Sequence, residues 1–213
     1  MFQEMTIRSH RIIVGALLVL AAPSLPARPV IVFFGDSLTV GYGVEPEQAY
    51  PALVQEMIDA AGIEAQVVNA GLSGETTAAG LRRIDWILSR PIDIFVLALG
   101  GNDGLRGIPV DETERNLDGI LQKVATRYPE AQLIVAGMES PPNMGETFTK
   151  AFRAVFPEVA EKHQAVLIPF LLEGVGGEKS LNLPDGIHPN PEGHLLVAEN
   201  VWAILEPVVT AAN

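Results

Sequence analysis

The chain has 213 residues, no cysteine, and a hydrophobic fraction of 48%. This length and composition suit one globular domain with a buried core, and the missing cysteines exclude disulfide bonds, a thiol nucleophile and a cysteine metal site. The net charge of −12 would repel nucleic acid and anionic membrane surfaces, so neither is an expected partner.

The first 28 residues differ in composition from the rest of the chain. Arg8, His10 and Arg11 precede an uncharged apolar run at 12–22, which prolines and small residues follow. This pattern is typical of a secretory signal peptide, because a membrane span needs about 20 apolar residues. We expect residues 1–28 to be a signal peptide, with an uncleaved membrane anchor as the alternative. The protein would then be periplasmic or secreted, and cleavage after residue 28 would leave a net charge of −14.

From residue 29 onward, short apolar runs alternate with amphipathic stretches. We predict strands at 30–34, 66–69, 92–99, 133–138 and 166–170. We predict helices at 50–61, 76–88, around 117–124, at 146–163 and from about 191 to 209, with Pro157 kinking or breaking the fourth. This alternation favours an α/β fold over residues 29–213. The expected architecture has three layers: a flavodoxin-like, doubly wound sheet of five parallel strands in the order 2-1-3-4-5, with helices on both faces.

The stretch VIVFFGDSLTVGYG at 30–43 places a serine just beyond the first strand. Gly35 can adopt backbone angles that other residues avoid, so the strand can turn sharply there. Ser37 would then lie at the carboxyl end of a central strand, where open α/β sheets bind their ligands. The structural alternative is that Ser37 only caps a helix.

Three further blocks of small and polar residues follow later strands. Residues 69–76 come after the second strand, 100–104 after the third, and 185–189 after the fifth. The carboxyl ends of parallel strands meet at one edge of a sheet, so we expect all four blocks to converge in one cleft.

The converging blocks supply the groups that nucleophilic catalysis needs. Ser37 is a weak nucleophile that requires an adjacent base, and His188 can be that base. Asp185, three residues earlier, can orient the imidazole. The backbone N–H groups of Ser37 and Gly74 and the side-chain amide of Asn102 are candidate donors to an oxyanion.

Structural interpretations remain for several of these residues. Gly74 and Asn102 can simply form turns, and Asp185 can be a turn residue while a carbonyl holds His188. Asp36 and Asp103 are expected to bind nearby backbone N–H groups. A metal site at Asp185, His188 and His194 is loosely spaced, so no metal is expected. The glycines at 41–43 and 100–101 lack the spacing of a dinucleotide-binding loop, so no cofactor is expected either.

The four blocks together resemble the SGNH family, also called GDSL hydrolases. By that resemblance Ser37, Gly74, Asn102 and His188 fill the four named positions, and Asp185 completes the triad. The segments SGET at 73–76, GGNDGLRG at 100–107 and DGIHPN at 185–190 are most similar to the bacterial periplasmic esterases that act as thioesterase, lysophospholipase and arylesterase. The likeness extends from residue 30 to the carboxyl terminus.

We therefore expect a monomeric serine esterase that hydrolyses small acyl esters, thioesters or lysophospholipids. Candidate substrate-contact loops lie at 105–107, 141–145 and 173–183, and the candidate binding residues are Leu105, Arg106, Pro141 and Met144. The alternative interpretation of these loops is plain surface connection. Alternative functions are a carbohydrate O-deacetylase of the same family and a non-catalytic acyl- or lipid-binding protein.

Overall fold

The computed structural model describes Met1 and residues 28–212. The predicted signal peptide or anchor falls on residues 2–27, which lie outside the described part of the chain. Among the helices of residues 28–212, none combines the length and apolar character that crossing a membrane requires.

The centre of the molecule is a sheet of five parallel strands. The strands are β1 (Val30–Gly35), β2 (Gln66–Asn69), β3 (Ile94–Ala98), β4 (Gln132–Ala136) and β5 (Val166–Ile168). Their order is β2-β1-β3-β4-β5, which confirms the predicted doubly wound topology. Every residue of β3 is buried, as expected of an apolar strand that helices cover on both sides. The predicted third, fourth and fifth strands extended too far at their carboxyl ends, because their apolar runs continue past the last strand pairing. Leu99 after β3 and Met138 after β4 are buried, whereas Pro169 after β5 is exposed.

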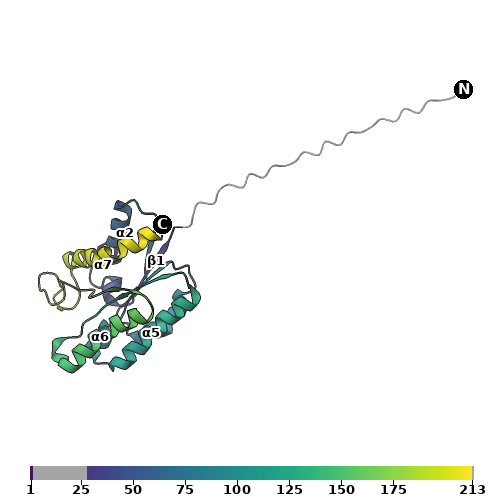
Figure 1. The fold of residues 1–213 in the computed structure, drawn as a ribbon. Helices are drawn as coiled ribbons and strands as arrows, with labels where there is room; N and C mark the ends of the chain where they lie inside the picture. The colour runs from purple at the N-terminus through teal and green to yellow at the C-terminus, as the bar shows by residue number, and fades with distance from the viewer. Residues whose placement is uncertain (2–27, 213) are drawn as a thin grey trace.

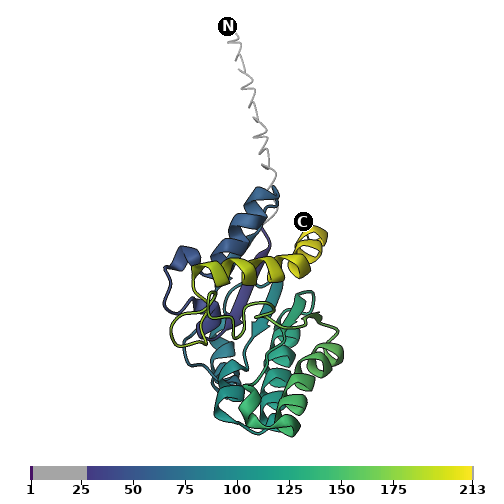
Figure 2. The same ribbon diagram turned by 90° about the vertical axis from the view of Figure 1, so that its left-hand side faces the viewer.

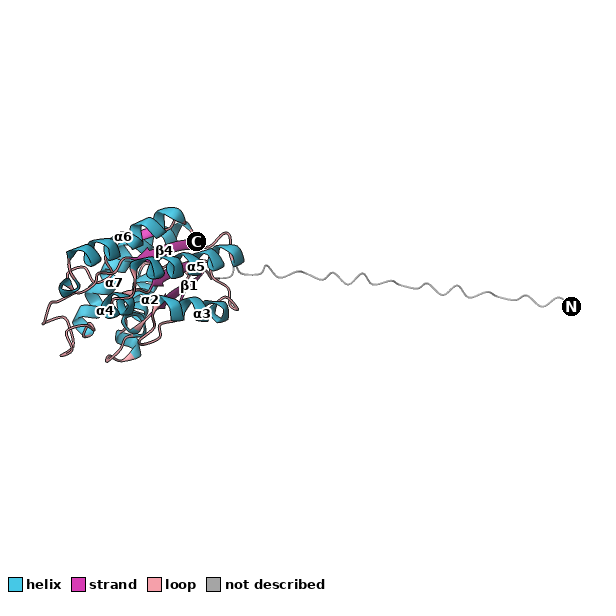
Figure 3. Cartoon of the chain, turned by 90° about the horizontal axis from the view of Figure 1, so that it is seen from below, coloured by secondary structure: helices cyan, strands magenta, loops and turns pink. Residues whose placement is uncertain are grey.

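Two layers of helices cover the sheet. The long helices are α2 (Tyr50–Ala60), α3 (Thr77–Ile87), α5 (Val110–Arg127), α6 (Glu146–Lys162) and α7 (Pro191–Ala211). In two perpendicular views α2 lies beside α7, while α5 lies beside α6 on the other side of the sheet (Figures 1 and 2). Helix α3 packs against α5 and completes the second layer, which the view from below also shows (Figure 3).

Four short helical segments were not predicted. They are α1 (Ser37–Val40), α4 (Gly101–Arg106), and the 3₁₀ turns η1 (Pro46–Gln48) and η2 (Pro142–Met144). Leu105 and Arg106, which we expected in a loop, therefore belong to α4. Such segments are too short for apolar periodicity to reveal them.

Pro157 does not break α6, contrary to one of the two outcomes predicted for it. The helix runs without interruption from Glu146 to Lys162. The Pro157 ring is exposed, whereas Phe156 and Val159 on either side of it are buried. Proline cannot donate the backbone hydrogen bond of a helix interior. Packing of the buried face of α6 stabilises the helix in spite of this missing bond.

Gly35 is required at the end of β1 for a different reason from the one predicted. Its φ is not among the positive values of the chain. A Cβ atom built at Gly35 would lie 2.0 Å from Thr39 Oγ1 and 2.7 Å from the Ala98 carbonyl oxygen. The glycine therefore provides space for α1 to pack closely over the strand end.

Candidate active site

A cavity of about 620 Å³ opens at the carboxyl edge of the sheet. Its lining includes Ser37 after β1, Gly74 after β2, Asn102 after β3, and His188 from the loop between β5 and α7. Four segments that are far apart in the sequence thus converge at one edge, as the strand order requires.

Ser37, His188 and Asp185 form a continuous hydrogen-bonded chain. His188 Nε2 lies 2.9 Å from Ser37 Oγ, and His188 Nδ1 lies 2.7 Å from Asp185 Oδ2. With Nδ1–H donating to the carboxylate, Nε2 is left as an acceptor for the Ser37 hydroxyl proton. The alternative in which a carbonyl holds His188 is therefore not what the structure contains.

Asp185 also stabilises the turn in which it lies, which was the alternative interpretation of this residue from the sequence. Its Oδ1 accepts hydrogen bonds from the backbone N–H groups of Ile187 and His188, at 2.9 and 3.0 Å. Burial would raise the pKa of Asp185, but the hydrogen bonds from His188 and from these backbone groups outweigh it and lower the pKa to about 2. Asp185 is therefore an ionised acceptor at neutral pH.

Backbone hydrogen bonds within the loop stabilise the segment that carries Asp185 and His188. The Leu183 N–H donates to the His188 carbonyl at 2.8 Å, and the Gly186 N–H donates to the Leu183 carbonyl at 2.9 Å. The buried side chain of Asn182 donates to the carbonyls of Val175 and Glu178, which ties this loop to the preceding one. Sequence reasoning did not identify Asn182, because nothing in its local pattern distinguishes it from an ordinary loop asparagine.

Ser37 is the first residue of α1 and does not cap it. The cap is Asp36, whose Oδ1 accepts the Leu38 N–H at 3.0 Å. Asp36 Oδ2 accepts from Asn102 Nδ2 at 3.2 Å. Burial raises the pKa of Asp36 to about 6, against the lowering effect of these two hydrogen bonds. The predicted backbone role of Asp36 is thus present, together with an unexpected contact to Asn102.

The three candidate oxyanion donors lie around the same cavity. Within residues 28–212, the backbone N–H groups of Ser37 and Gly74 donate to no protein acceptor. One of the two Nδ2 hydrogens of Asn102 is directed to Asp36, which leaves the second without a protein partner. These unused donors at one cavity are the arrangement that can stabilise a developing negative charge.

His194 and Asp103 both have structural contacts. His194 is buried, and its Nδ1 accepts the backbone N–H of Tyr50 at 3.2 Å. Asp103 accepts from the backbone N–H and the hydroxyl of Thr77. Among the described residues no group of three histidines or carboxylates has metal-binding geometry.

Apolar side chains form most of the remaining cavity wall. They are Leu38, Leu105, Met138, Pro141, Pro142, Phe170, Leu172 and Ile187. Two of the predicted substrate-contact residues, Leu105 and Pro141, are among them. Met144 and Arg106 are not: Met144 Cε lies beside Gly107, and Arg106 hydrogen-bonds to protein groups.

Several lining residues escaped sequence reasoning. Met138 and Phe170 fall inside the predicted strands 133–138 and 166–170, whereas in the structure they lie just beyond the ends of β4 and β5. The Tyr42 ring lies 4.5 Å from the His188 imidazole, between ring centroids. Its place five residues after Ser37 in the same block is the sequence signal that could have indicated this contact.

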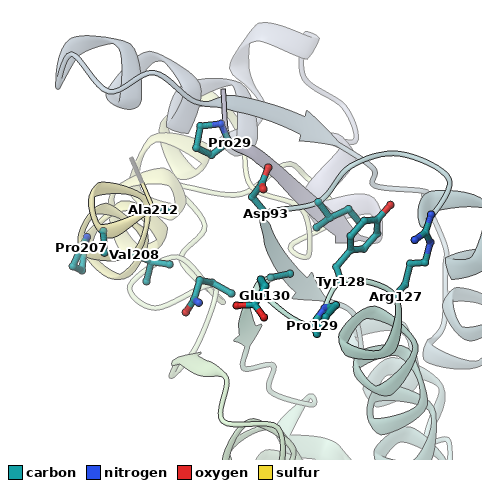
Figure 4. Close-up of a pocket in the computed structure, with 13 residues that line it drawn as sticks. Pro29, Asp93, Arg127, Tyr128, Pro129, Glu130, Pro207, Val208 and Ala212 are labelled. Carbon is teal, nitrogen blue, oxygen red and sulfur yellow. The ribbon is translucent and has the colours of Figure 1, made fainter. Parts of the chain in front are cut away.

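A second cavity of about 740 Å³ lies at the opposite, amino-terminal edge of the sheet (Figure 4). It is larger than the cavity at Ser37, but two of its polar side chains already have structural partners. Asp93 accepts the Val30 N–H, and the Tyr128 hydroxyl donates to the carbonyls of Leu88 and Arg90. We therefore assign the candidate active site to the smaller cavity, where a nucleophile and a base meet.

Two curated proteins of known name match most of this chain. Esterase TesA of Pseudomonas aeruginosa is 36% identical over 197 residues, which is 92% of this chain and 96% of that protein. Thioesterase 1/protease 1/lysophospholipase L1 of Escherichia coli strain K12 is 35% identical over 193 residues, or 90% of each chain.

Solved structures of related proteins have the same fold. The psychrotrophic esterase EstA from Pseudoalteromonas sp., in a structure inhibited by monoethylphosphonate, superposes with a TM-score of 0.80 at 30% identity. The match covers 85% of this chain and 98% of that one. Residues 33–196 also match the GDSL-like lipase/acylhydrolase family model, so this chain belongs to that family.

Proposed function

We propose that this ester-bond hydrolase uses Ser37 as its nucleophile, His188 as its general base and Asp185 to orient the imidazole. The observation that carries the proposal is the unbroken chain from Ser37 Oγ through both His188 nitrogens to Asp185 Oδ2. The substrate class is carboxylic esters and thioesters of acyl groups, with arylesters and lysophospholipids as members of it.

The reaction begins with attack of Ser37 Oγ on the substrate carbonyl carbon. His188 Nε2 takes the hydroxyl proton, and the Ser37 and Gly74 N–H groups and Asn102 Nδ2 donate to the resulting oxyanion. His188 then gives its proton to the leaving alcohol or thiol as the tetrahedral intermediate collapses to an acyl-enzyme. Water, deprotonated by His188, attacks the acyl carbonyl, and Ser37 leaves with the proton restored.

The apolar part of the cavity fits the acyl portion of such a substrate. Leu105 of α4, Pro141 after β4 and Phe170 after β5 present hydrocarbon surface beside the catalytic serine. Burying an acyl chain there removes its surface from water, with about 0.8 kcal/mol gained per buried CH₂. Of the phenylalanine, tyrosine and tryptophan side chains, Tyr42 and Phe170 line the cavity. Two such rings offer little surface on which a sugar could stack, so the lining favours an acyl substrate over a carbohydrate.

A panel of substrates tests the proposed activity. Purified protein should hydrolyse p-nitrophenyl acetate, longer p-nitrophenyl acyl esters and acyl thioesters, and Ser37→Ala should lose activity on all of them. An acetylated sugar should be a poorer substrate. Preference for the acetylated sugar would support the O-deacetylase alternative, and no hydrolysis by the wild-type protein would support the binding alternative.

We also propose that residues 1–28 direct export and that 29–213 form one hydrolase domain, which acts as a monomer. The basic flank and the short apolar run at 12–22 support the export signal. Amino-terminal sequencing of periplasmic material should find a start between residues 23 and 29. Full-length protein in the membrane fraction would instead support the anchor.

A further inference from the structure

Arg106 joins the two segments that carry the side-chain and glycine oxyanion donors. It is the last residue of α4, one helical turn after Asn102. Its Nη2 donates to Asn102 Oδ1 and to the Gly74 carbonyl oxygen, each at 3.2 Å. This nitrogen carries two hydrogens, so it can make both bonds at once.

These contacts determine which way the Asn102 amide faces. Asn102 lies between the Asp36 carboxylate, which accepts from Nδ2 at 3.2 Å, and the Arg106 guanidinium, which donates to Oδ1. An amide turned by 180° would place its oxygen against the carboxylate and its NH₂ against the guanidinium, and both contacts would be repulsive. Charges of opposite sign on the two sides therefore hold the second Nδ2 hydrogen toward the cavity.

The bond to Gly74 extends the same effect to the neighbouring segment. Gly74 supplies both the carbonyl that Arg106 binds and the backbone N–H that is a candidate oxyanion donor. The φ of Gly74 is 77°, which lies in the left-handed region. Fixing this carbonyl limits the rotation of the peptide groups around Gly74. One guanidinium nitrogen thus links the segment that follows β2 to the segment that follows β3 at the cavity.

The geometry does not favour a direct role for Arg106 in holding substrate. The residue is exposed and lies outside the cavity lining, although Asn102 and Leu105 of the same helix are part of that lining. Its Nη2 is already bonded to two protein oxygens.

We propose that Arg106 is a positioning residue of the oxyanion hole, which orients Asn102 and Gly74 and does not itself touch the substrate. The inference rests on the proposed function, in which these two residues are oxyanion donors. It replaces the direct substrate contact expected for Arg106 from the sequence.

The first test separates positioning from substrate binding. Arg106→Met removes the donors and keeps an unbranched side chain. On p-nitrophenyl acetate, which is neutral, kcat should fall by about tenfold with little change in KM, because the lost interaction acts in the transition state. Arg106→Lys should recover part of kcat, since an ammonium reaches one of the two oxygens but not both with the same geometry. Arg115→Met, which removes an exposed arginine from α5, is the matched control and should leave kcat unchanged.

The second test is a double-mutant cycle with Asn102→Ala. If Arg106 acts through Asn102, then Arg106→Met should reduce kcat less in the Asn102→Ala background than in the wild type. The remaining effect would come from Gly74.

Two outcomes would overturn the inference. One is an unchanged kcat in Arg106→Met, or an increase in KM confined to anionic substrates such as lysophosphatidylglycerol. The other is full additivity with Asn102→Ala. Hydrolysis that persists in Ser37→Ala would instead overturn the proposed function, so the two failures are distinguishable. Arg106→Lys keeps the test valid if Arg106→Met does not fold.

Discussion

At the scale of single residues, we propose that proton transfer belongs to His188 and stabilisation of the oxyanion charge to Asn102. His188 hydrogen-bonds to the hydroxyl of Ser37, whereas the Asn102 side chain hydrogen-bonds to Asp36 and Arg106. An amide does not titrate near neutral pH, so Asn102 cannot act as a general acid or base. Its contribution belongs to the transition state, where the oxyanion appears.

Asn102→Ala should lower kcat on a neutral ester by about 10²–10³ with little change in KM. His188→Ala should cost more, because the nucleophile is then no longer activated. Steady-state kinetics on p-nitrophenyl acetate measure both effects. An increase in KM alone for Asn102→Ala would show that Asn102 binds the ground state of the substrate.

The residues that we propose for the chemistry could be identified from the sequence, but the residues that position them could not. Ser37, Gly74 and Asn102 follow β1, β2 and β3, and the parallel topology brings these strand ends to one edge. His188 lies in the long loop between β5 and α7, and its block was recognised by its resemblance to the family. The contacts of Asp36 and Arg106 with Asn102 depend on side-chain directions across two strand ends. No periodicity or spacing in the sequence encodes those directions.

At the scale of elements, the turn from β3 into α4 determines where Asn102 lies. Gly100 has a φ of 123°, and a Cβ atom there would lie 2.9 Å from Phe156 Cζ of α6. The left-handed backbone lets α4 begin at once after the strand, so Asn102 falls in its first turn. Strands and long helices were predictable because their apolar periodicity extends over several residues, whereas this turn depends on one glycine.

Gly100→Ala should lower both stability and activity. The strained backbone and the contact with Phe156 should reduce the free energy of unfolding by about 1–3 kcal/mol, and the shift of α4 should reduce kcat. Gly62→Ala is the matched control, because Gly62 also has a positive φ but a Cβ atom there would meet nothing within 4 Å. It should cost only the backbone strain and leave kcat unchanged. Equal kcat values for the two variants would contradict this account of the turn.

At the scale of the whole molecule, His194 makes stability depend on pH. It belongs to α7 and has 1% of its surface exposed, and its Nδ1 accepts the N–H of Tyr50, the first residue of α2. Burial, with a smaller contribution from His188, lowers the pKa of His194 from 6.5 to about 4. The unfolded chain takes up the proton first as the pH falls. This contribution to stability is therefore fully present above pH 6.5 and is lost between about pH 6.5 and pH 4.

His194→Gln should reduce this pH dependence. The difference in the free energy of unfolding between pH 7.5 and pH 5 should be smaller in the variant by roughly 2 kcal/mol. Urea denaturation at the two pH values measures it, and other titrating groups cancel because both proteins contain them. The same pH dependence in both proteins would show that His194 does not titrate as proposed.

The proposed mechanism requires that one serine among all those in the chain is the nucleophile. A fluorophosphonate should react once per molecule, and peptide mass spectrometry should place the phosphonyl adduct on Ser37. Labelling should be absent in Ser37→Ala and much slower in His188→Ala, because the histidine activates the hydroxyl. An adduct on another residue, or undiminished labelling of Ser37→Ala, would contradict the account.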